Sequence, residues 1–254
     1  MASFTILGSS SGMPHPHRAC SGYVLQVGES LNLIDCGGGV ASSFLRCGFD
    51  PLKLDRIFIS HTHSDHVAEL TLFIQMLHVL EAGRRLAVYV PDEFVDRFED
   101  YLEAVYLFGP RLRLDLEIHG YGDGLVIDEG FRLIAIANSH IAKLAPYLRE
   151  NNLRNKMQCY SFKIEVNDRS LLYSADIGSF DDIRGCLDGL DYALVETTHV
   201  DVGEIIEHAR TSTVKQYILT HLGNDDEAAG IDKRVRAAGI TNMLLAADGM
   251  RLDL

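Results

Sequence analysis

The sequence predicts an α/β fold in which two β-sheets pack together, with helices on their outer sides. Short segments rich in Val, Ile, Leu, Phe and Tyr recur along the chain, and turn residues bound most of them. Between some of these lie segments with apolar residues at three- and four-residue spacing, as in amphipathic helices. The strands form two clusters, one ending near Val90 and the other starting near Phe131. No linker or repeat divides them, so we expect residues 1–254 to form one domain with two similar halves.

Strands are expected where a β-branched or aromatic run meets a turn signal such as Gly28-Glu29 or Asn167-Asp168. In chain order, the expected strands are residues 4–7, 23–27, 31–34, 56–60, 86–90, 131–137, 161–166, 170–173, 192–196, 216–220 and 242–246.

Helices are expected in the segments between strands. Residues 65–80 place Val67, Leu70, Ile74 and Leu77 on one face, and Gly83 follows as a stop signal. The expected later helices are one that opens at residues 91–93, one at 203–211 and one at 225–238. We interpret the apolar stripes of these helices as core packing.

The composition limits the classes of function. A chain of 254 residues with 47% hydrophobic and 23% charged residues is typical of a globular protein with its own core. The net charge of −13 argues against unaided binding to a polyphosphate backbone. No apolar run approaches 18 residues, so no membrane span is expected. The five cysteines show no CxxC spacing, and the N-terminus shows no secretory signal, so we expect free thiols and a cytoplasmic protein.

The most informative pattern is the His-x-His-x-Asp-His run formed by His61, His63, Asp65 and His66. A random chain of this composition would contain it about two times in a thousand. His61 and His63 are two residues apart after a strand, so both can reach one cation through neutral imidazole nitrogens. Asp65 and His66 start the next turn and face a neighbouring position. Four ligands do not complete two metal shells, so further ligands are expected at other strand ends.

Three distant residues meet that expectation. His140, Asp176 and His221 each follow an expected strand, in this order along the chain. A single histidine or aspartate after a strand would be an ordinary loop residue. Three of them behind the His-x-His-x-Asp-His run favour metal ligation.

With these residues the chain resembles the metallo-β-lactamase-fold hydrolases, and within them the ribonuclease Z and related phosphodiesterase branch. The resemblance runs from the Gly-Ser-Ser-Ser-Gly run at 8–12, through the Asp-Cys-Gly-Gly-Gly run at 35–39, to His221. It implies a four-layer αβ/βα sandwich of two mixed sheets with helices on the outer faces and a dinuclear site at one edge. It also implies that Asp35 orders the metal loops without being a ligand. The implied ligands are His61, His63 and His140 for one metal, Asp65, His66 and His221 for the other, and Asp176 as the bridge.

The resemblance also implies two catalytic residues upstream of the last ligand. Glu196-Thr-Thr-His199 lies where ribonuclease Z proteins carry a catalytic His at a helix start and a Glu before it. The segment departs from that family in reading His-Val-Asp where His-Ser-Thr is usual. The long arm that grips the tRNA elbow also has no obvious equivalent. These departures and the acidic balance favour substrates smaller than tRNA.

The expected chemistry follows from this set. Two divalent ions about 3.5–4 Å apart bring the pKa of a shared water toward neutrality and offset charge on a phosphodiester. Asp65 can orient that water, and His199, held by Glu196, can protonate the leaving oxygen. Zinc is the default ion for a His-rich set, with manganese and iron left open.

Residues 143–156, which follow His140, are locally basic. They are either a solvated helix face or a lid in which Arg149 and Arg154 contact a substrate phosphate.

The sequence thus predicts a metal-dependent hydrolase acting on a small or short phosphodiester. Alternatives on the same fold are a thioester, lactone or sulfate-ester hydrolase and a tRNA 3′-end-processing endoribonuclease. A non-enzymatic metal-binding module is the remaining class. A homodimer stays open by analogy with the family.

Overall fold

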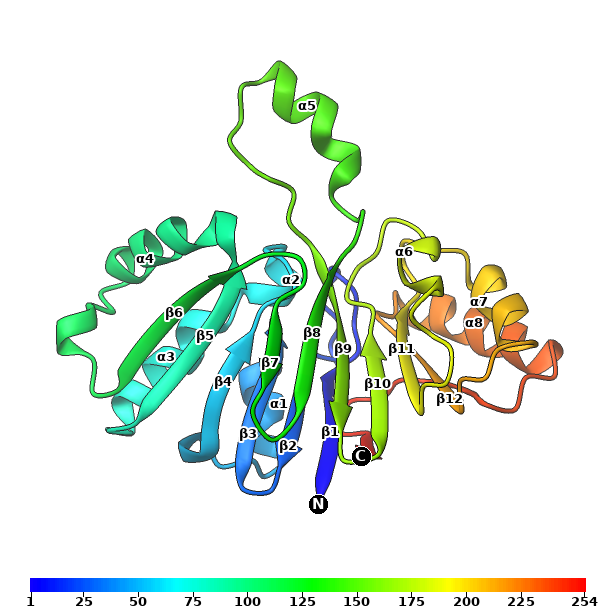
Figure 1. Ribbon diagram of the computed structural model, residues 1–254, viewed down its shortest axis with the longest axis horizontal. Helices are drawn as coiled ribbons and strands as arrows, with labels where there is room; N and C mark the ends of the chain where they lie inside the picture. The colour runs from blue at the N-terminus through cyan, green and yellow to red at the C-terminus, as the bar shows by residue number, and fades with distance from the viewer. The chain divides into compact units, whose positions relative to one another are not determined.

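The computed structural model describes residues 1–254 and contains two compact units. The first unit comprises Met1–Gly8, Pro16–Tyr121 and Ala247–Asp253, and the second comprises Ser9–His15, Gly122–Ala246 and Leu254. Each unit contains one seven-stranded mixed sheet with helices (Figure 1). The predicted α/β class is therefore observed in both units, and the single-domain organisation of residues 1–254 stays a prediction.

The first sheet has the strand order β14-β1-β2-β3-β4-β5-β6. The pairs β14–β1, β1–β2 and β2–β3 are antiparallel, whereas the pairs β3–β4, β4–β5 and β5–β6 are parallel. The carboxyl ends of β3 and β4 therefore meet at the same edge. The bounds are β1 Ala2–Gly8, β2 Gly22–Val27, β3 Ser30–Cys36, β4 Leu54–Phe58, β5 Arg85–Pro91, β6 Asp115–Tyr121 and β14 Arg251–Asp253.

Helices of the first unit pack on one face of this sheet. They are α1 Val40–Arg46, α2 Ser64–Val67, α3 Leu70–Val79 and α4 Val95–Ala104, with short 3-10 turns at Pro51–Lys53, Asp92–Phe94 and Gly109–Arg111. Phe44 of α1 and Phe73 of α3 meet edge to face with ring centroids 5.5 Å apart. Phe98 of α4 joins the same buried cluster. This apolar layer supports the strands whose ends carry the histidine pattern.

The prediction of one helix over residues 65–80 is wrong, because the chain breaks between α2 and α3. Glu69 leaves the helical conformation, and its backbone N–H donates to the Cys36 carbonyl at 2.9 Å. Its carboxylate accepts from the N–H groups of Gly39 and Ala41, both at 2.7 Å, and so caps the start of α1. These partners lie about thirty residues upstream, so the periodicity of residues 65–80 could not reveal the break.

The second sheet has the strand order β13-β12-β11-β10-β9-β8-β7. The pairs β10–β11, β11–β12 and β12–β13 are parallel, whereas the pairs β7–β8, β8–β9 and β9–β10 are antiparallel. The carboxyl ends of β10, β11 and β12 therefore lie at one edge. The bounds are β7 Val126–Asp128, β8 Arg132–Ala137, β9 Tyr160–Val166, β10 Arg169–Tyr173, β11 Tyr192–Glu196, β12 Gln216–Thr220 and β13 Met243–Leu245.

The helices of the second unit are α5 Ala145–Glu150, α6 Asp181–Arg184, α7 Val202–Ala209 and α8 Asp225–Ala237, with a 3-10 turn at Ala142–Leu144. Phe180, Ile205 and Val235 join Tyr217 and other strand residues in one buried cluster under α6, α7 and α8. By contrast, α5 lies on a segment that extends beyond the ends of β8 and β9 (Figure 1, top).

Three strands were not predicted: β6, β7 and β14. The sequence of β6, Asp-Leu-Glu-Ile-His-Gly-Tyr, mixes acidic and apolar residues because an edge strand needs only one apolar face. The strands β7 and β14 have three residues each, too few for a periodic pattern. None of the helices has the length and hydropathy that a membrane span requires.

Candidate metal centre

The first unit gathers the four residues of the His-x-His-x-Asp-His run at the end of β4. His61 has its ring centroid 4.7 Å from that of His63 and 4.1 Å from that of His66. Asp65 Oδ2 lies 3.5 Å from His66 Nε2. His61 and His66 are fully buried, whereas His63 is exposed. The loop and the first turn of α2 thus present imidazoles and a carboxylate in one small volume.

Asp35 orients this cluster from the end of β3. Its Oδ2 lies 2.8 Å from His66 Nδ1, and it accepts from the backbone N–H and the hydroxyl of Ser60 at 2.7 and 2.8 Å. Because the carboxylate only accepts, His66 carries its proton on Nδ1 and keeps the Nε2 lone pair for a cation. Asp35 is fully buried and adopts a left-handed backbone conformation with φ of 54°. This geometry fits the ordering role expected of it.

Close backbone packing fixes the same loops. A Cβ atom at Gly37 would lie 1.9 Å from the carbonyl oxygen of Asp65, so only glycine permits this approach of the two chain segments. The glycine run after Asp35 therefore has a steric function beside the histidines.

The second unit forms its own cluster around Asp176, which follows β10. His140 Nε2 lies 3.6 Å from Asp176 Oδ2, and His221 Nε2 lies 3.4 Å from Asp176 Oδ1. All three side chains are buried. Each carboxylate oxygen therefore faces a different imidazole, which is the arrangement that a carboxylate bridging two cations needs. His221 has a φ of 55°, a strained conformation that is typical of functional sites.

Glu196 and His199 stand beside this carboxylate. His199 Nδ1 lies 3.2 Å from Glu196 Oε1 and 3.7 Å from Asp176 Oδ2. Glu196, buried at the end of β11, also accepts from the backbone N–H groups of Thr198 and His199 at 2.6 and 2.9 Å. The hydrogen bond with Glu196 raises the pKa of His199, against a smaller lowering by burial. His199 is thus suited to hold a proton near neutral pH, and 27% of its side chain is exposed.

The donor set fits divalent metal ions. Within its unit, Asp176 is faced by three histidines: His140, His199 and His221. The imidazoles of His140 and His221, when neutral, do not balance this buried carboxylate, whereas a metal cation does. Imidazole nitrogens with carboxylate oxygens are the ligands of zinc, and also of manganese and iron sites.

The basic segment lies outside both clusters. Arg149 on α5 and Arg154 beyond it are exposed, and their side chains make no ion pair or hydrogen bond. Lys143, at the base of the segment, is close enough for its charge to oppose the rise in the pKa of His199. The substrate contacts expected of Arg149 and Arg154 stay predictions.

Sequence reasoning missed Ser60 and Glu69. Ser60 immediately precedes His61, and that position was the available signal. Glu69 bonds to the backbone of Gly39 and Ala41, which are distant in sequence, so its neighbours in the chain gave no signal.

The family model of the beta-lactamase superfamily domain matches residues 32–222, about three quarters of the chain. The chain belongs to the β-lactamase superfamily. It is 26% identical over 269 residues to a ribonuclease Z of Methanothermobacter thermautotrophicus, with 87% of each chain covered. It is 31% identical over 170 residues to ribonuclease BN of Escherichia coli, which covers 64% of this chain and 49% of that protein. This chain therefore spans about half the length of ribonuclease BN.

Solved structures show the fold. The metallo-β-lactamase fold protein YhfI from Bacillus subtilis has a TM-score of 0.78 at 21% identity and covers 99% of this chain and 98% of its own. The short form of human tRNase Z gives 0.74 at 18% identity over 99% and 98%. A diphosphatase from the PhnP family gives 0.73 at 18% identity over 100% and 98%. The metallo-β-lactamase fold and the ribonuclease Z-like resemblance predicted from the sequence are thereby confirmed.

Proposed function

We propose that this superfamily member is a metal-dependent hydrolase of phosphodiesters, whose two histidine clusters together bind two divalent ions. His61, His63, His140 and Asp176 would hold one ion, and Asp65, His66, Asp176 and His221 the other. The names of the relatives support the substrate class, since ribonuclease Z and ribonuclease BN are named for cutting RNA.

One observation carries the proposal: Asp176 faces His140 with one oxygen and His221 with the other, beside the Glu196–His199 pair. A bridging carboxylate supplies a two-ion site. A separate protonated histidine supplies the acid that a poor leaving group needs. Hydrolysis of activated esters would not require that acid, so the pair favours phosphodiesters over thioesters, lactones and sulfate esters.

Each residue of the proposed site has its own role in the hydrolysis. When bound, the ions would supply Lewis acidity that activates a water and offsets phosphate charge. Asp65 would accept a hydrogen bond from the attacking water and orient it. Glu196 holds His199 through Nδ1, so His199 donates a proton from Nε2 to the leaving oxygen. Asp35 keeps His66 in the tautomer that presents Nε2.

Zinc is the ion that we propose, because the set is rich in imidazole; manganese and iron stay alternatives because it also holds carboxylates. We further propose a cytoplasmic location, which the free state of all five cysteines supports. By analogy with the family, a homodimer is the assembly that we propose.

A tRNA 3′-end-processing endoribonuclease is the second candidate. The observation that favours it is the projecting segment of residues 142–156, which carries the exposed cations Lys143, Arg149 and Arg154 (Figure 1). Exposed cations on an otherwise acidic chain are available to a phosphate backbone.

Metal analysis coupled to a substrate panel tests the function. We expect about two zinc-class ions per chain and hydrolysis of bis(4-nitrophenyl) phosphate, with slower or no turnover of nitrocefin and lactones. Cyclic nucleotides and a tRNA precursor separate the two phosphodiester candidates. A metal-loaded protein that hydrolyses lactones or thioesters and leaves every phosphodiester intact would contradict the proposal.

A further inference from the structure

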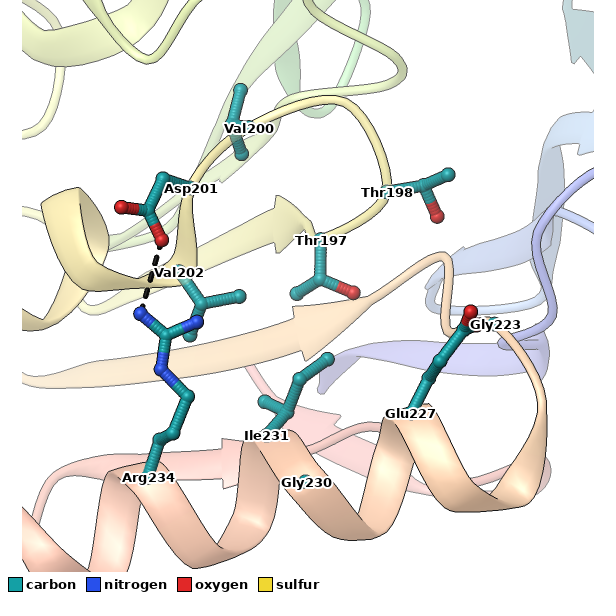
Figure 2. Close-up of a pocket in the computed structure, with 10 residues that line it drawn as sticks. All are labelled: Thr197, Thr198, Val200, Asp201, Val202, Gly223, Glu227, Gly230, Ile231 and Arg234. Atoms are coloured by element: carbon teal, nitrogen blue, oxygen red, sulfur yellow. Dashed lines mark hydrogen bonds and ion pairs between the residues drawn. The ribbon is translucent and has the colours of Figure 1, made fainter.

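A pocket of about 410 Å³ lies in the second unit between the His199 loop and helix α8 (Figure 2). His199 does not line it, because its ring is directed at Glu196 and Asp176. The pocket is therefore adjacent to the Asp176 cluster but separate from it. Its lining residues are Thr197, Thr198, Val200, Asp201, Val202, Gly223, Glu227, Gly230, Ile231 and Arg234.

Gly230 is the first sign that the pocket receives a ligand. It lies inside α8, Asp225–Ala237, where glycine is less favourable than alanine. A Cβ atom at this position would meet nothing within 4 Å, so no packing contact requires glycine here. The missing side chain leaves the pocket open, at the expense of helix stability.

Three aliphatic side chains line part of the pocket. Val200 and Val202 lie on the loop side, and Ile231 points from α8 toward the loop, on the side of Thr197 (Figure 2). Aliphatic side chains on two sides of an open space favour a flat, apolar-faced group between them.

The polar edge of the pocket is dominated by hydrogen-bond acceptors. The hydroxyls of Thr197 and Thr198 already donate to the carbonyls of Thr220 and His221, at 3.2 and 2.7 Å. Their oxygens can therefore only accept from a ligand. The carboxylate of Glu227 accepts from the Asn224 N–H in a capping box and keeps further lone pairs.

The charges disfavour an anion. Arg234 donates to Asp201 at 3.0 Å, and Asp201 also accepts from the Gly203 N–H at 2.9 Å (Figure 2). The guanidinium is thus matched by one carboxylate, and Glu227 adds a second. A phosphate would meet an excess of negative charge, whereas a neutral group with N–H donors would meet acceptors.

We propose that this pocket binds a nucleoside through its base. A base is flat, has apolar faces and carries N–H donors on its edge, and the volume suits a ligand of that size. The nucleoside is either free or part of a phosphodiester substrate; the second case rests on the proposed function. In both cases the ligand contacts Thr198 and Val200, the two neighbours of His199, and so restrains the loop that carries it.

Isothermal titration with adenosine, guanosine, cytidine and uridine tests binding without any turnover. We expect at least one to bind with a dissociation constant on the order of 0.1 mM, with ribose alone as the unbound control. Gly230→Leu fills the pocket and should weaken binding at least about tenfold, whereas Ala229→Leu places the same side chain at an exposed position of α8 outside the lining and should not.

Gly230→Ala guards against a folding artefact. It should raise the thermal midpoint, because alanine favours the helix, and at the same time weaken nucleoside binding. A stabilised variant with lower affinity cannot be explained by misfolding. Absence of binding by all four nucleosides at about 10 mM, or equal binding by ribose, would overturn the proposal.

Kinetics then distinguish the two sources. If the base belongs to the substrate, Gly230→Leu raises KM for the 4-nitrophenyl ester of adenosine 5′-monophosphate but leaves bis(4-nitrophenyl) phosphate unchanged. If the nucleoside is a free effector, added adenosine changes kcat for bis(4-nitrophenyl) phosphate without competing with it. If adenosine binds but no phosphodiester is hydrolysed, the result supports the nucleoside pocket and contradicts the proposed function. If phosphodiesters are hydrolysed but no nucleoside binds, the result supports the proposed function and contradicts the nucleoside pocket.

Discussion

Asp176 and Asp191 are two buried carboxylates at opposite ends of the parallel strands of the second sheet. Asp176 follows the carboxyl end of β10, and Asp191 precedes the amino end of β11. Both side chains are at most 5% exposed. The partners of the two carboxylates differ, and that difference separates a structural site from a candidate metal site.

Asp191 is neutralised by the chain itself. Its Oδ1 accepts from Arg169 Nη1 at 2.7 Å and from Lys215 Nζ at 2.8 Å, and its Oδ2 accepts from the Ser170 N–H at 2.9 Å. Burial raises the pKa of Asp191, but these hydrogen bonds outweigh burial and hold its pKa well below the usual range. Permanent cations complete this site without any ligand.

Asp176 is surrounded by histidines instead. Three imidazoles lie within 3.7 Å of its oxygens, and one of them, His199, also pairs with Glu196. His140 and His221 turn Nε2 toward the carboxylate, and a lone pair on each of these nitrogens can bind a cation that Asp176 also binds. A buried carboxylate that the chain neutralises contributes to stability, whereas one that faces lone pairs needs a metal ion.

The largest expected effect is that of Asp176→Asn. The variant should lose bound metal and lower kcat/KM for bis(4-nitrophenyl) phosphate on the order of a thousandfold, because an amide is a poor bridge between two cations. The thermal midpoint of the metal-free protein should not fall, because the amide removes the cost of burying the carboxylate charge. Metal content and kinetics are measured together, with Asp191→Asn as the matched control that keeps its metal. Equal metal content in both variants would contradict the conclusion that Asp176, unlike Asp191, is a metal ligand.

His199→Ala is expected to keep its metals and lose the proton donor. Turnover of esters with poor leaving groups should fall about a hundredfold, while 4-nitrophenyl esters, which need no acid, should lose much less. His119→Ala, which removes a partly exposed histidine of the first unit, should change neither. Equal losses on both classes of ester would remove His199 from the acid role.

Asp35→Asn tests a third buried carboxylate, whose partners are Ser60 and His66 in the first unit. An amide cannot accept the His66 proton as strongly, so we expect metal affinity about ten- to a hundredfold weaker. Competition with a chelator measures this affinity. Asp55→Asn, on neighbouring β4, loses ion pairing with Arg84 but should bind metal as before. An unchanged affinity in Asp35→Asn would show that Asp35 serves folding alone.

The same comparison explains what the sequence could reveal. The candidate ligands were predictable because four lie within six residues and three follow strands whose carboxyl ends share an edge. The Asp191 site was not, because Arg169 and Lys215 lie 22 and 24 residues away and their residue types are common. Contacts made by tertiary structure between ordinary residues leave no local pattern.

The strands and helices also fall into those that a local pattern predicts and those that depend on distant contacts. Central strands were predicted from their apolar runs, whereas the edge strand β6 was missed because its outer face carries Glu117 and His119. The helix break at Glu69 depends on distant Gly39 and Ala41. Local periodicity therefore predicts the central elements, and long-range hydrogen bonds decide where elements end.

The smallest expected effect is on stability, in Asp191→Asn. Arg169 and Lys215 are about half and two thirds exposed, so solvent screens their pairing, and we expect a loss of about 1–2 kcal/mol at pH 7. The folded-state pKa is lowered, so the contribution of Asp191 is complete above the unfolded pKa near 4 and is lost progressively as the pH falls from there through the lower folded-state pKa. Urea unfolding at pH 7 and pH 3 should therefore show a gap between the two proteins that narrows in acid. A gap that stays constant would mean that the carboxylate charge does not stabilise the fold, and Asp191 would then differ from Asp176 only in its neighbours.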